Sequence, residues 1–117
     1  MESSKSLSFS ITTTDSNLGW GLLDGQEKKT LADGLTIVSK GGTIHETAVP
    51  FPETYTFLIQ LMASIPVEVA VGLLTNYIYD KLQSKPETKL KIGKLDVKVE
   101  KREIQRVILE NLELTKE

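Results

Sequence analysis

The chain has 117 residues, enough for one domain with a single hydrophobic core; 39% of them are hydrophobic and 26% charged. This balance lies far from that of disordered chains. The formal net charge of −2 produces no overall field that would attract nucleic acid or an anionic membrane. Cysteine is absent, which excludes disulfides, thiolate metal sites and cysteine nucleophiles.

The composition and the hydropathy pattern predict a cytoplasmic protein of one domain. Residues 1–6 are polar and are expected to form a flexible N-terminus, followed by a single domain over residues 7–117. The N-terminal segment lacks the apolar core of a signal peptide. Residues 55–74 have the length of a membrane span, but Glu68 is costly in lipid and Pro66 interrupts the helix.

The first third of the chain predicts short antiparallel strands. Residues 7–13 alternate between apolar and hydroxyl side chains, which is the period of a half-buried strand. Residues 15–17 have the composition of a turn, and residues 18–23 are expected to return as a partner strand that carries Trp20. The polar residues 26–30 suit a loop or one helical turn.

A second pair of strands is predicted next. Asp33-Gly34 marks a turn before the β-branched residues 35–39, which form a strand. The Gly41-Gly42 pair is expected to close a tight hairpin onto residues 43–46.

Two consecutive helices are expected in the middle of the chain. The shorter one begins at Pro52 and uses the apolar residues Leu58, Leu61, Met62 and Ile65. The longer one, over residues 64–85, has Ser64 as a candidate N-cap and a stripe of apolar residues at spacings of four and three. Its first half is apolar nearly all round, so it must be covered on more than one side.

A β-hairpin is predicted over residues 89–99, with a type II′ turn at Gly93-Lys94. This register places Ile92 opposite Leu95 and Leu90 opposite Val97 on one face, and pairs Lys91 with Asp96 on the other.

Residues 101–113 suit an amphipathic helix, although an alternating strand is the alternative. The expected fold is therefore α+β: short antiparallel strands and a hairpin in the second half of the chain, packed against a long central helix, a shorter preceding helix and a C-terminal helix.

Few residues are suited to catalysis. His45 is the single histidine, so any histidine-dependent or histidine–metal site must use it, and an exposed histidine without a role is the favoured interpretation. The aspartates near glycine or asparagine are explained by turn formation. We therefore expect no enzymatic activity, no cofactor and no metal.

The remaining features suggest macromolecular contacts. The broad apolar surface of the long helix favours a protein partner or a homo-oligomer, with Trp20, Tyr77 and Tyr79 as candidate interface residues. The expected function is that of a small non-catalytic interaction or regulatory protein. The alternative is a nucleic-acid-associated module that uses a lysine-rich sheet face formed by Lys89, Lys91, Lys94 and Lys98.

Overall fold

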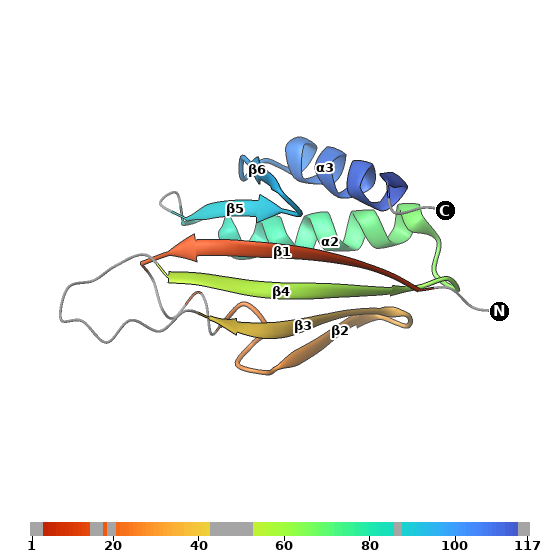
Figure 1. Cartoon of the computed structure of the whole chain (residues 1–117), viewed down its shortest axis with the longest axis horizontal. Helices are drawn as coiled ribbons and strands as arrows, with labels where there is room; N and C mark the ends of the chain where they lie inside the picture. The colour runs from red at the N-terminus through yellow and green to blue at the C-terminus, as the bar shows by residue number, and fades with distance from the viewer. Residues whose placement is uncertain (1–3, 15–17, 19–20, 43–52, 86–87, 115–117) are drawn as a thin grey trace.

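The computed structural model of the chain describes residues 4–14, 18, 21–42, 53–85 and 88–114. These residues form an α+β fold in which two helices pack on one face of a six-stranded antiparallel sheet (Figure 1). The elements are β1 (Ser4–Thr13), β2 (Lys28–Ala32), β3 (Leu35–Gly42), β4 (Glu53–Met62), α2 (Val67–Leu82), β5 (Lys89–Ile92), β6 (Leu95–Val97) and α3 (Lys101–Leu114).

The strand order is β2-β3-β4-β1-β5-β6, so the N-terminal strand lies inside the sheet (Figure 1). β1 pairs with β4 along its whole length and with β5 over residues 9–12. Phe9 lies directly opposite Phe57, and their rings stack with centroids 5.1 Å apart. This aromatic pair lies in the core between the sheet and the helices.

The strict alternation of β1 is confirmed by its burial. Leu7, Phe9 and Ile11 are buried, and the serines between them, Ser8 and Ser10, are exposed and half-buried. The Asp33-Gly34 turn and the strand that follows it are also confirmed. Gly34 has φ +93°, in the left-handed region that glycine adopts without strain.

The prediction of a short helix that begins at Pro52 is wrong. Residues 53–62 form the strand β4, with Tyr55, Phe57, Ile59 and Leu61 buried in alternation. Its outward residues Leu58 and Met62 are also apolar. Together with the buried Leu61 they have spacings of three and four, which resemble those of a helix. The run of β-branched and aromatic residues favours the strand.

Three predictions in the first half of the chain also need correction. Residues 18 and 21 are helical and residues 22–25 form a turn, in place of a strand over 18–23. The polar segment at 26–30 contains most of β2, an edge strand, where lysine residues are common because they oppose edge-to-edge pairing. β3 continues through Gly41 and Gly42, so these glycines are not a hairpin turn; residues 43–46 lie outside the described residues.

The second half of the chain is predicted correctly in its elements. α2 and α3 have the expected positions, although Pro66, and not Ser64, directly precedes the first helical residue of α2. The hairpin has the predicted register, with Leu90 opposite Val97, Lys91 opposite Asp96 and Ile92 opposite Leu95. Leu95 is half exposed because β6 lies at the edge of the sheet. No helix in the described part of the chain is long and apolar enough to cross a membrane.

Candidate functional site

Two surfaces of the described chain are candidates for binding: the outward side of the sheet and a cleft at one end of the helix layer. We call the first the open face. It consists of the strand residues that alternate with the buried ones, which are Ser6, Ser8, Ser10 and Thr12 of β1, Lys28 and Thr30 of β2, Thr36, Val38 and Lys40 of β3, Thr54, Thr56, Leu58, Gln60 and Met62 of β4, Lys89 and Lys91 of β5, and Asp96 of β6.

The open face is rich in hydroxyl groups and has a small apolar centre. The strand register places Lys28, Val38, Leu58 and Ser8 in one row across four neighbouring strands. Val38 and Leu58 are half-buried although no described helix lies over them. Some hydroxyls bond to each other across the strands, as Thr12 does with Thr54 at 3.0 Å.

The charges of the open face are mostly positive. Its charged members are Lys28, Lys40, Lys89, Lys91 and Asp96, so four cations are balanced by one anion. Lys28 and Lys91 lie four strand spacings apart, which corresponds to about 19 Å. That separation exceeds the screening length in physiological salt, so the two ends of the face act as separate positive sites.

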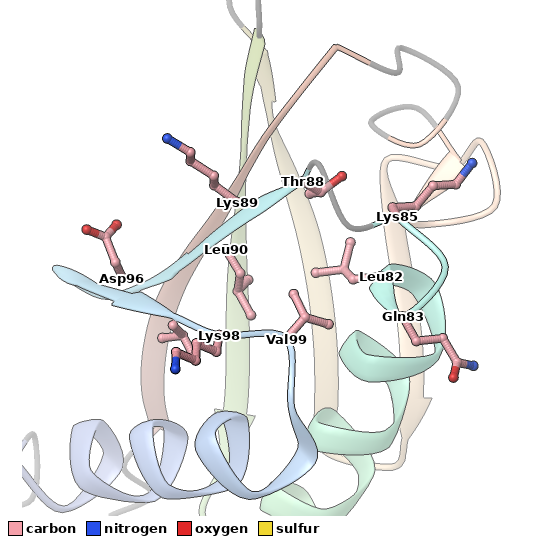
Figure 2. Close-up of a pocket in the computed structure, with 10 residues that line it drawn as sticks. Leu82, Gln83, Lys85, Thr88, Lys89, Leu90, Asp96, Lys98 and Val99 are labelled. Carbon is pink, nitrogen blue, oxygen red and sulfur yellow. The ribbon is translucent and has the colours of Figure 1, made fainter.

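The second candidate, which we call the lysine-rimmed cleft, has a volume of about 780 Å³. It lies between the C-terminal end of α2, the hairpin and the segment that leads into α3 (Figure 2). It is lined by Leu82, Gln83, Lys85, Thr88, Lys89, Leu90, Asp96, Val97, Lys98 and Val99. Figure 2 shows Leu82, Leu90 and Val99 pointing toward one another, whereas the ends of Lys85 and Lys89 extend away from the centre.

The structure separates the four lysines predicted as a nucleic-acid face. Lys89 and Lys91 lie on the open face, Lys94 belongs to the hairpin turn, and Lys98 follows the last residue of β6 and lines the cleft. All four are exposed. Aromatic side chains of the described strands, which are Phe9, Tyr55 and Phe57, are buried on the opposite side, so the open face offers no platform for base stacking.

The tyrosines predicted as interface residues have partners within the chain. The Tyr77 hydroxyl donates a hydrogen bond to the Leu22 carbonyl, and burial raises the pKa of Tyr77 to about 12, with a smaller contribution from the Asp24 carboxylate. The Tyr79 ring lies 5.3 Å from the Lys101 ammonium. As interface residues both stay predictions, and Trp20 and His45 lie outside the described residues.

The connection between β1 and β2 is held against α2 by charge. The Asp24 carboxylate accepts hydrogen bonds from Lys29 and from Lys81, the latter at 3.0 Å. These hydrogen bonds lower the pKa of Asp24 from 3.8 to about 2. Lys81 also lies over the Tyr77 ring at 5.5 Å, so this cluster links the connection to α2.

Sequence reasoning did not identify Val38, Leu58 and Val99 as parts of a binding surface. The alternation of β4 could have identified Leu58 as an outward apolar residue once the segment was recognised as a strand. Among the described residues, no group of three or more histidine, cysteine, aspartate or glutamate side chains is arranged to hold a metal ion. Family models, curated proteins and solved structures contain no match to this chain.

Proposed function

We propose that this chain is a non-catalytic interaction protein whose open face binds an acidic surface of another protein. The observation that carries the proposal is that the helices cover one face of the sheet only, while the other face presents lysines and hydroxyls around Val38 and Leu58. An apolar centre within a polar surround is the usual organisation of a protein interface.

The charge of the open face determines the chemistry of the partner. Four lysines against one aspartate favour an acidic surface, because complementary potentials accelerate encounter and disfavour wrong partners. The small apolar centre would receive an aliphatic side chain of the partner. Two positive ends about 19 Å apart suit acidic groups on both sides of that side chain.

Nucleic acid is the second candidate, because Lys28, Lys89 and Lys91 share the open face. Contacts to phosphate need only such cations and hydroxyls. The absence of aromatic residues among its described members favours the protein partner, since single-stranded nucleic acid is bound largely through stacking on aromatic rings.

The test is a selection of random displayed peptides on the folded chain, followed by NMR mapping of a selected peptide. We expect peptides with Asp or Glu around an aliphatic residue, and amide shifts centred on Ser8, Val38 and Leu58. Combining Lys28→Glu with Lys91→Glu should weaken binding by about tenfold, because both positive ends are reversed. The matched control Arg102→Glu reverses an exposed charge on α3 and should have little effect.

Two results would contradict the proposal. Selected peptides without charge preference, or peptides that shift the amides of α2 and α3, would place the binding surface elsewhere. A third result would favour nucleic acid as the ligand of the open face. In that case no peptide is selected, and a DNA oligonucleotide binds at low salt to the unchanged chain but not to the charge-reversed variant.

A further inference from the structure

The lysine-rimmed cleft is separate from the centre of the open face and has a different chemistry. Its apolar floor is built from three successive segments of the chain: Leu82 ends α2, Leu90 lies in β5, and Val99 lies between β6 and α3. Figure 2 shows these side chains converging on the hollow. Leu82 and Leu90 are almost fully buried, so the floor is fixed by the core beneath it.

The rim of the cleft is positive. Lys85, Lys89 and Lys98 line it together with one anion, Asp96. Neither Lys89 nor Lys98 forms an ion pair with any residue in the described part of the chain. Lysine ammonium groups are compact charges on flexible four-carbon stems, so their ends can move over a ligand that occupies the floor.

We propose that the lysine-rimmed cleft binds a small amphipathic carboxylate, with its alkyl chain on the half-buried Val99, over the buried Leu82 and Leu90, and its carboxylate beside Lys98. The volume of about 780 Å³ falls within the range of about 300–1,000 Å³ that is usual for small-molecule sites. The lining contains aliphatic and no aromatic side chains, which suits an alkyl chain better than a flat ring. An anionic head group matches the rim.

The test uses decanoate below its micellar concentration, measured by calorimetry and by NMR on the folded chain. We expect saturable binding that shifts the amides of Thr88, Leu90 and Val99. Each methylene removed from the probe should weaken binding by at most about fourfold. Decanol and a decylammonium salt are the matched probes, and both should bind more weakly than decanoate.

Variants separate the floor from the rim. Lys98→Gln should weaken decanoate binding by about threefold, and Val99→Asp should abolish it because a carboxylate would occupy the half-buried end of the floor. Asp96→Asn should strengthen binding, since it removes the anion of the rim. Lys28→Gln, at the opposite edge of the sheet, is the control that should change nothing.

Three outcomes would overturn the inference: no decanoate binding, equal binding of decanol and decanoate, or binding that persists in the folded Val99→Asp variant. Co-sedimentation with anionic vesicles in the absence of decanoate binding would also overturn it, because the surface would then recognise a membrane. Lys98 and Val99 are not on the open face, so this result is independent of the peptide selection.

Discussion

Asp24 is a turn residue whose carboxylate pairs with two lysines, Lys29 and Lys81. It adopts φ +56° and accepts hydrogen bonds from Lys29 and Lys81, so one turn residue joins β2 to α2. Asparagine also tolerates the left-handed region, so Asp24→Asn removes the charge without straining the backbone. Comparing Asp24→Asn with the unchanged chain therefore isolates the contribution of the Asp24 charge to stability.

We predict that Asp24→Asn lowers the thermal midpoint at pH 7, and that this difference disappears in acid. Because the pKa of Asp24 is lowered to about 2 in the folded chain, its stabilising contribution is present above the ordinary pKa of 3.8 and is lost as pH falls toward about 2. Thermal unfolding of both proteins between pH 7 and pH 2 measures this. A difference that stays constant with pH would mean that the ion pairs do not stabilise the fold.

Thr75, unlike Asp24, has an unsatisfied polar group: its buried hydroxyl oxygen has no hydrogen-bond partner in the described structure. An unpartnered buried hydroxyl costs free energy that valine, which has the same shape, does not. We predict that Thr75→Val stabilises the chain by about 1 kcal/mol in urea unfolding. Thr75→Ser, the control, keeps the hydroxyl, loses a buried methyl group and should destabilise by about 1 kcal/mol. A less stable valine variant would show that the hydroxyl has a partner.

At the scale of elements, the β5–β6 hairpin is joined to α3 through Gly93. This glycine has φ +61°, and a Cβ placed on it would lie 2.6 Å from the Asn111 side-chain oxygen. Asn111 has little freedom to move, since its amide nitrogen donates to the Val107 carbonyl at 2.8 Å. The Gly93 amide in turn donates to the Ser8 carbonyl at 2.8 Å, which ties the turn to β1.

We therefore predict that Gly93→Ala lowers the free energy of unfolding by about 1–3 kcal/mol, from backbone strain and steric contact together. Adding Asn111→Ala should recover the steric part only, because the positive φ remains. Urea unfolding of the two single variants and the double variant gives the coupling free energy. Strictly additive effects would show that the two residues do not touch.

Helices and strands were predictable from the sequence where the spacing of apolar residues and a turn motif indicated the same structure. The hairpin combined a Gly93-Lys94 turn with alternating burial and an opposite-charge pair, and its register is correct. The prediction for β4 failed because its outward face also carries the apolar residues Leu58 and Met62, which blur the period of two. β2 failed because the lysines of an edge strand resemble those of a loop.

The candidate binding surfaces were less accessible to prediction, because they depend on how the elements are arranged in space. Lys28 and Lys91 are distant in sequence and share a face only because β1 and β4 are inserted between β3 and β5. The floor of the lysine-rimmed cleft likewise requires α2, β5 and the segment before α3 to meet. No local pattern specifies such meetings. The expectation of an interaction protein thus stays a prediction, now with a stated surface.

For the whole molecule, we predict a single-chain mass in solution by light scattering across a range of concentrations and salt. The two sheet edges oppose self-pairing, since β2 carries Lys28 and Lys29 and β6 has three residues only. A dimer that is stable in salt and lost on Val38→Asp would instead assign the open face to a second copy of the chain. The control Leu109→Asp alters an exposed apolar residue on α3 and should not affect such a dimer.

The place of β1 in the sheet also has a consequence for biosynthesis. β1 leaves the ribosome first, yet its two neighbours are residues 53–62 and 89–92, so neither of its edges is satisfied until most of the chain has been made. Contacts between such distant segments form slowly. During translation the alternating Leu7, Phe9 and Ile11 are therefore open to chaperones and to misassociation until β4 and β5 have been made.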